Sequence, residues 1–206
     1  VTGINIFLCI ALMGVVCTIY TYFGGMEAVV WTDVLQVTIL VGGVLACITV
    51  ASAGVEGGLL AVYEKGISLG KLDLYNPGWS YSETTAWVLI VGFAFLTLTP
   101  YTSDQTVVQR YLTTSDEKTA AKSVWTNAWM TLISISVFYS LGTALFFFYM
   151  ENPAQIASTR GEEILPTFIV HNLPVGVAGI VIAGIFAATM SSLDSSINSS
   201  ATVVLN

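Results

Sequence analysis

The segment LPVGVAGIVIAGIFAATMSSLDSSINSSATVV, residues 173–204, decides the fold class of this chain. Residues 173–189 carry no charged side chain, and residues 190–204 then hold repeated serines and Asp194. An uncharged apolar run of this length is typical of a membrane-spanning helix, which needs roughly 17–25 residues. Hydroxyls and carboxylates are costly in lipid, so their place at the end of such a helix indicates a function.

The rest of the chain has the composition of a membrane protein. It is 55% hydrophobic and only 9% charged, with a mean hydropathy of +0.80. Soluble domains carry about 25% charged residues, so the soluble class is excluded. Apolar runs predict five membrane helices, at about 4–22, 29–53, 86–108, 123–149 and 173–200. We therefore predict an all-α polytopic transmembrane bundle that forms a single domain over residues 1–206.

Charge and cysteine content exclude other classes of partner. The net charge is -7, and no basic run is present that could hold nucleic acid. The three cysteines lie in apolar runs without metal or disulfide spacing, which is typical of small buried side chains. The lipid bilayer is the expected environment. Because the chain begins at Val1 and ends at Asn206 within a helical pattern, we interpret it as an internal fragment of a longer protein.

Alternation of the predicted helices places distant polar residues at one depth. The 29–53 helix starts on the side of the membrane where the 173–200 helix ends, so Asp33 lies near the later serines. Counting from Pro174 at about 1.5 Å per residue, Ala188 lies roughly 21 Å along its helix and Ser195 roughly 32 Å. The basic residues Arg110, Lys118 and Lys122 cluster on this same side, which indicates that it is cytoplasmic.

Four positions of the last helix share one stripe, at i, i+3, i+4 and i+7: Ala188, Ser191, Ser192 and Ser195. Hydroxyl, carbonyl and carboxylate oxygens suit small hard cations, whereas zinc or copper would favour His or Cys. Serines in membrane helices also bond to their own backbone or join helices, and Asp33 could be merely interfacial. Two carboxylates at one depth, Asp33 and Asp194, favour a cation site.

The predicted helix 86–108 contains a second polar feature. Pro100 lies inside it, among Thr97, Thr99, Thr102 and Ser103. Proline removes a backbone hydrogen bond, and nearby hydroxyls can satisfy the freed carbonyls or leave them for a ligand. A simple kink and a broken helix that binds a solute both fit this pattern.

Three motifs carry a family resemblance: GGMEAVVWTDVLQ at 24–36, DQTVVQRYLTT at 104–114 and AATMSSLDSSINSSATV at 187–203. Together, and in this order, they resemble the sodium:solute symporter family, whose members transport sugars, sialic acid, proline, monocarboxylates, vitamins and iodide. The resemblance implies part of a LeuT-like inverted-repeat fold, about core helices 4 to 8.

The resemblance also implies ligands for Na⁺ as the coupling ion. A first sodium site would use Ala188, Ser191 and Ser192, together with a core helix that is absent here. A second site, found in some members, would use Asp33, Asp194 and Ser195. The position of Asp194 is often Ser or Thr in the family, so this carboxylate could strengthen cation binding or bind a proton instead.

Substrate and gate positions are implied in the same way. Pro100 and Tyr101 match the region of an aromatic gate, and Thr97 lies near a polar substrate contact. Thr131 stands where a galactose transporter has a sugar-contacting lysine. This difference argues against simple sugars, and favours sialic acid, another sugar acid or a small organic anion.

The resulting expectation is a sodium-coupled symporter that moves a small organic solute, such as a sugar acid, sugar or monocarboxylate, by alternating access. The similarity to bacterial members predicts a multi-pass protein of the bacterial inner membrane. An enzyme is not expected: a GxGD motif is absent, and His171 lies on the opposite side from the serines. A proton-coupled symporter, or a transporter-like sensor that feeds a signalling domain, remain alternatives.

Overall fold

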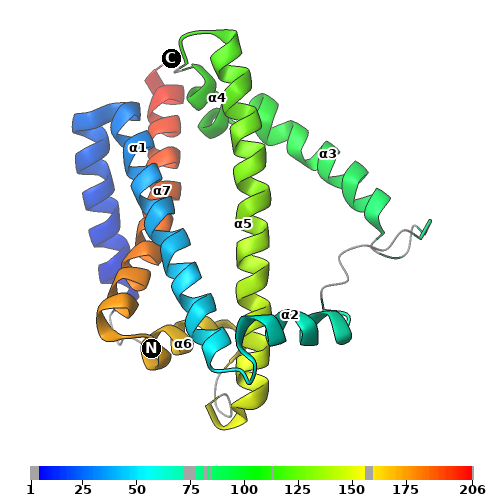
Figure 1. Cartoon of the computed structure of the whole chain (residues 1–206). Coiled ribbons are helices and arrows are strands. Elements are labelled where there is room, and N and C mark those ends of the chain that lie inside the picture. Colours follow the sequence, from blue (N-terminus) through cyan, green and yellow to red (C-terminus); the bar gives the residue numbers. More distant parts are fainter. Residues whose placement is uncertain are drawn as a thin grey trace. The chain divides into compact units, whose positions relative to one another are not determined.

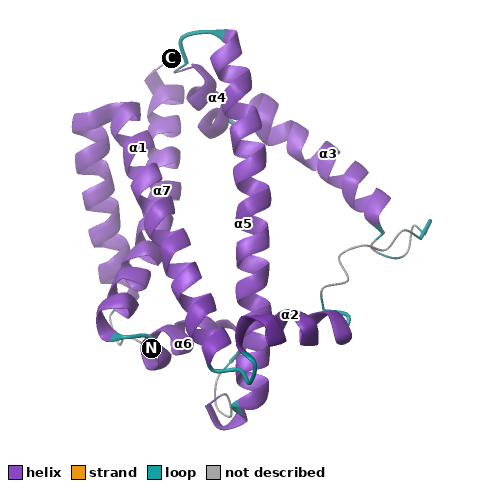
Figure 2. Ribbon diagram, in the orientation of Figure 1, coloured by secondary structure: helices purple, strands orange, loops and turns teal. Residues whose placement is uncertain are grey.

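The computed structural model describes residues 5–71, 78–80, 83, 85–112, 114–155 and 160–205. Within these residues every regular element is helical (Figure 2). The elements are α1 (Ile6–Ala53), α2 (Gly58–Ser68), α3 (Ala86–Ser103), α4 (Gln105–Leu112), α5 (Glu117–Glu151), α6 (Ile164–Asn172) and α7 (Val175–Leu205). Two short 3₁₀ turns, Pro153–Gln155 and Gly161–Glu163, connect α5 to α6.

Five helical segments are long and apolar enough to cross a membrane. They are Ile6–Gly25, Glu27–Ala53, Ala86–Ser103, Glu117–Glu151 and Val175–Val204. These segments confirm the five predicted helices and the all-α fold class. The predicted start of the first helix at residue 4 lies outside the described residues.

Gly25 divides α1 into two apolar halves, Ile6–Gly25 and Glu27–Ala53. Its backbone has φ 55° and ψ −153°, a conformation that is open almost only to glycine. A side chain at this position would be strained by the backbone alone. The sharp change of direction between the two halves therefore depends on this residue.

Polar side chains fix where several helices begin. The Asn5 side chain accepts the Phe7 N–H at 2.9 Å at the start of α1. Asp116 Oδ1 accepts the Thr119 N–H at 3.0 Å and so caps α5. Both are the side-chain types that satisfy the free N–H groups of a first helical turn.

The prediction of one helix over 86–108 is wrong. α3 continues through Pro100 but ends at Ser103, and Asp104 is extended with φ −75° and ψ 115°. The Asp104 carboxylate accepts hydrogen bonds from the hydroxyl and the N–H of Thr106, in the first turn of the separate helix α4. These bonds hold the pKa of the exposed Asp104 carboxyl below its usual value. An aspartate in this role competes with helix continuation, which explains the break.

The chain divides into two compact units, Tyr63–Thr131 and the combination of Val1–Val62 with Leu132–Asn206. The combined unit holds α1, α6, α7 and the later part of α5. Its core is built from buried apolar side chains that include Val44, Cys47, Ala51, Leu141, Ala144, Phe147, Phe148, Phe168, Ile169, Ala178 and Val181. The expectation of a single domain over 1–206 stays a prediction.

Candidate cation-binding site

Helix α7 contacts both halves of α1, and the two contacts run in opposite directions. Cys17 lies near the Met190 carbonyl, and Thr21 bonds to Asp194, with the same sequence separation in both pairs, so the first half of α1 runs parallel to α7. The second half runs antiparallel, as Figure 1 shows from the blue, cyan and red segments. The polar end of α7 is thus bordered by two different helices.

Glycines bring the second half of α1 close to α7. A side chain on Gly43 would lie 2.9 Å from Val181, and one on Gly184 would lie 3.5 Å from the Leu40 backbone. Small residues at such contacts allow membrane helices to pack closely. The packing fixes which residues of the two helices share a level.

Asp33 and Ser191 meet across this contact. The Ser191 hydroxyl donates to Asp33 Oδ1 at 2.5 Å, a short hydrogen bond between residues that are 158 positions apart. This confirms the predicted shared depth of Asp33 and the serines of the last helix. A carboxylate and a hydroxyl now converge at one point between two helices.

Other hydroxyls of α7 behave differently from that of Ser191. Ser196 bonds to the Ser192 carbonyl at 2.8 Å, and Ser199 to the Ser195 carbonyl at 2.6 Å. Such bonds within one helix are the ordinary behaviour of membrane serines. Ser191 instead reaches a partner helix, which distinguishes it as a candidate ligand.

The remaining predicted ligands lie on the same part of α7. Ala188 and Ser195 are half-buried, and Ser192 is exposed in this chain. An exposed Ser192 agrees with the expectation that a further helix supplies the rest of the first site. The assignment of these residues as sodium ligands stays a prediction.

Asp194, which the resemblance places in one sodium site with Asp33, has a different hydrogen-bond partner here. Its side chain is fully buried, and its Oδ1 accepts the Thr21 hydroxyl at 3.4 Å on the other half of α1. Its Oδ2 has no hydrogen-bond partner among the described residues. Asp33, on the second half of α1, therefore bonds to α7, whereas Asp194 of α7 bonds to the first half of α1.

Sequence reasoning missed Thr21 and Gln36. Thr21 could not be found because its contact with α7 depends on the turn at Gly25. A glycine turn in the sequence does not indicate which helix the preceding segment will contact. Gln36 had a usable signal: it is an amide within an apolar run, one helical turn after Asp33. It is only 8% exposed, and its Oε1 has no hydrogen-bond partner in the described part of the chain.

The electrostatic character of α1 and α7 favours cations. Their charged residues are Glu27, Asp33 and Asp194, whereas all Lys and Arg residues lie outside both helices. A small cation would meet acidic and neutral oxygen groups here, with no competing basic side chain on either helix. Hard oxygen donors are the ligands such cations prefer.

The predicted gate and substrate residues lie in the Tyr63–Thr131 unit. Thr97 donates to the Phe93 carbonyl at 2.8 Å, and Thr131 to the Asn127 carbonyl at 2.8 Å, so both hydroxyls bond to their own helices. The Asn127 amide donates to the Tyr101 hydroxyl at 2.6 Å, which links α5 to α3 just after Pro100. Asn127 was not anticipated from the sequence.

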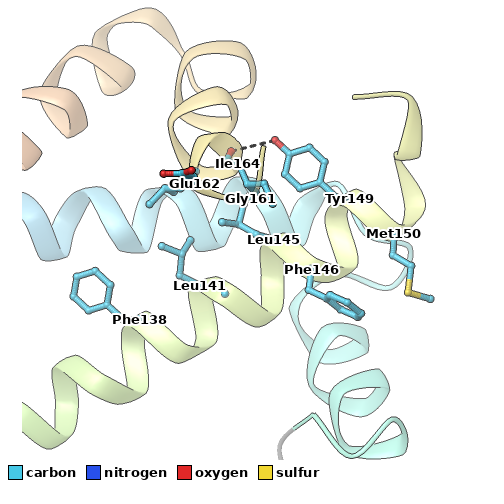
Figure 3. Close-up of a pocket in the computed structure, with 11 residues that line it drawn as sticks. Phe138, Leu141, Leu145, Phe146, Tyr149, Met150, Gly161, Glu162 and Ile164 are labelled. Carbon is cyan, nitrogen blue, oxygen red and sulfur yellow. Dashed lines mark hydrogen bonds between the residues drawn. The ribbon is translucent and has the colours of Figure 1, made fainter. Parts of the chain in front are cut away.

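A separate pocket of about 680 Å³ lies between α5 and residues 161–165 (Figure 3). It is lined by Phe138, Leu141, Gly142, Leu145, Phe146, Tyr149, Met150, Gly161, Glu162, Ile164 and Leu165. In it the Tyr149 hydroxyl donates to the Ile164 carbonyl at 3.4 Å. The lining is mostly apolar and contains no predicted ligand, so this pocket is distinct from the oxygen-rich end of α7.

Known proteins are similar to this chain in sequence. Sodium/sialic acid symporters of Proteus mirabilis and Aliivibrio fischeri are 38% and 40% identical, over 96% and 91% of this chain and over 40% and 38% of their own lengths. A sodium-dependent multivitamin transporter of Oryctolagus cuniculus is 34% identical over 100% of this chain and 33% of its length. The chain thus spans about two fifths or less of these relatives.

A solved structure shares the fold. It shows a Na⁺-coupled sialic acid symporter in a substrate-bound outward-open state with a novel Na⁺ site, and matches with a TM-score of 0.85 at 38% identity. The match covers 96% of this chain and 42% of that protein. The family model of the sodium:solute symporters matches residues 1–206. This chain therefore belongs to the sodium:solute symporter family.

Proposed function

We propose that this chain is the ion-coupling part of a sodium-driven symporter in the cell membrane. The observation that carries the proposal is the short contact between Asp33 and Ser191, at 2.5 Å, where α1 and α7 meet. Intramembrane acids are functional by default, and this one shares its level with the oxygen stripe of α7. Family membership and the sodium-coupled relatives support the same conclusion.

The proposal includes two sets of sodium ligands. The first comprises Ala188, Ser191 and Ser192, completed by a helix outside this chain. The second comprises Asp33 and Ser195. Asp194 is left out of the second set because its carboxyl engages Thr21 on the opposite half of α1.

The coupling mechanism depends on packing between helices. A sodium ion bound by oxygens of α7 and a neighbouring helix would hold them together and stabilise the form of the transporter that accepts solute. When the site opens toward the cytoplasm, sodium leaves, the helices separate and the solute follows. A ligand shifts such an equilibrium only by its difference in affinity for the two forms, so sodium must bind one of them more tightly.

Sialic acid is the first candidate solute. The sialic acid symporters are 38% and 40% identical to this chain, whereas vitamin, monocarboxylate and iodide transporters are 29–34% identical. Thr131, in place of a sugar-contacting lysine, agrees with a substrate other than a simple sugar. Tyr101, held by Asn127, is proposed as part of the gate over that solute.

The test is uptake of labelled sialic acid by the full-length protein in proteoliposomes. An inward sodium gradient should drive uptake, and an equal potassium gradient should not. The double variant Ser191→Ala, Ser192→Ala should lose the sodium stimulation. Uptake driven equally well by a proton gradient without sodium would favour the proton-coupled alternative.

The choice of solute is tested separately in the same vesicles. Unlabelled sialic acid should compete with the labelled compound, whereas pyruvate, biotin and iodide should not. Sodium-driven uptake of one of these instead would keep the coupling proposal and replace the solute. Sodium binding without uptake of any solute would favour the sensor alternative.

A further inference from the structure

Gln36 is a buried amide that neither proposed sodium set uses. It is 8% exposed, whereas its neighbours Leu35 and Val37 are 61% and 56% exposed. Successive positions of a helix point in different directions, so the burial of this one position shows that its side chain faces the protein interior. An amide is an unusual choice there, because apolar residues fill most of this half of α1.

The level of Gln36 along α7 follows from its neighbours on the same helix. Asp33, one turn before Gln36, meets Ser191. Leu40, one turn after, lies against Gly184. Because this half of α1 runs antiparallel to α7, Gln36 lies level with the turn of α7 between those two contacts.

That turn contains Ala188, the first member of the first sodium set. Gln36 Oε1 is covered by protein atoms and has no hydrogen-bond partner among the described residues. Burying a carbonyl oxygen without a partner costs free energy, which a bound cation would recover. The charged residues of α1 and α7 are all acidic, so neither helix offers a basic side chain for this role.

We propose that Gln36 Oε1 is an additional ligand of the sodium ion bound at Ala188 and Ser191. This inference rests on the proposed sodium coupling and deepens it. An amide oxygen is a hard neutral donor of the kind that such ions accept. Its contribution makes the ion bridge the second half of α1 to α7, so that the packing of these two helices becomes dependent on sodium.

The test uses the purified full-length protein, with sodium affinity and thermal stability as separate readouts. Gln36→Leu should weaken sodium binding about tenfold, as the loss of one ligand-shell group does. Without sodium it should be as stable as the wild type or more stable, because an unpaired buried amide is gone. Gln36→Glu keeps an oxygen and should retain sodium binding.

The matched control is Thr38→Val on the exposed face of the same helix. The Thr38 hydroxyl bonds to the Val34 carbonyl of its own helix at 2.8 Å, so sodium affinity should not change. Should Gln36→Leu fail to fold, Gln36→Met replaces it, since it keeps the length without the oxygen.

Wild-type sodium affinity in Gln36→Leu or Gln36→Met would overturn the assignment of Gln36 while leaving sodium coupling intact. Loss of stability without sodium, with sodium affinity kept, would also overturn it and indicate a packing role. If the wild type itself showed no sodium binding, the proposed function would fail, and this inference with it.

Discussion

The contact between α1 and α7 has two ends with different chemistry. At the apolar end, Val44 and Cys47 of α1 join Ala178 and Val181 of α7 in the buried core. At the polar end lie Thr21, Asp33, Gln36, Ser191 and Asp194.

The polar end is built at a cost to stability. Gln36 Oε1 and Asp194 Oδ2 are covered but lack hydrogen-bond partners among the described residues. Apolar residues of similar size would serve packing better at both positions. Such local conflicts are expected at functional sites. We therefore infer that packing at the apolar end fixes the register of the two helices, and that the function of the polar end depends on this register.

Phe168→Ala should have the largest effect, and it should act on stability alone. Phe168 of α6 belongs to the same buried core as the apolar end. It is fully buried and packs edge-to-face on Phe148 with ring centroids 5.1 Å apart. Removal of its ring should cost about 3–5 kcal/mol of unfolding free energy, with a smaller cost for Phe168→Leu. Thermal unfolding of the full-length protein measures this, and sodium affinity of the folded fraction should stay unchanged. A selective loss of sodium affinity would break the division between the two ends.

Asp33→Asn should have the opposite effect: it should lower sodium affinity without lowering stability. The substitution keeps the shape but removes the charge that faces Ser191, so sodium affinity should fall by about 2 kcal/mol, roughly 30-fold. Stability without sodium should be equal to or higher than that of the wild type, since the charge of a half-buried carboxylate is removed. Sodium titration of the purified protein measures the affinity. Wild-type affinity in this variant would remove Asp33 from the site.

Gly25→Ala should affect both ends, because the turn at Gly25 positions both halves of α1 against α7. A side chain at φ 55° should cost about 1 kcal/mol or more. The control is Gly14→Ala in the first half of α1, where an added methyl meets no atom within 4 Å and should be neutral or slightly stabilising. Thermal unfolding of both variants compares them, and equal stability would show that the turn does not depend on Gly25.

The smallest effect is expected at Asp104, outside both ends. Hydrogen bonds from Thr106 lower the pKa of its carboxyl. Its capping contribution to stability is therefore complete above the pKa of an ordinary aspartate carboxyl, about 4. The contribution is lost as pH falls through the lower folded value. Hydrogen exchange at the first amides of α4 should speed up in that acidic range, and at all pH values in Asp104→Ala. Sodium affinity near neutral pH should not change in that variant.

The membrane helices and the shared depth of Asp33 and the α7 serines could be predicted from the sequence because both follow from regular rules. Apolar run length gives the spans, and alternation of direction gives the shared depth. The end of α3 at Ser103 was missed because the apolar pair Val107 and Val108 follows Asp104. Only the capping bonds to Thr106 decide the boundary.

The partner of Asp194 could not be predicted for a different reason. Helix counting gives depth but not the angle at which a side chain leaves the helix relative to its neighbours. Thr21 reaches Asp194 because the turn at Gly25 brings the first half of α1 back alongside α7. The register of that contact is a tertiary property, set by packing between residues far apart in the chain.

The central claim is that the polar end of the α1–α7 contact binds the coupling ion. Its most direct test is sodium titration of the full-length protein carrying Ser191→Ala, compared with Ser196→Ala, whose hydroxyl bonds only within α7. We predict sodium affinity at least about tenfold weaker in Ser191→Ala and unchanged in Ser196→Ala. Equal sodium affinities in both variants and the wild type would contradict the claim.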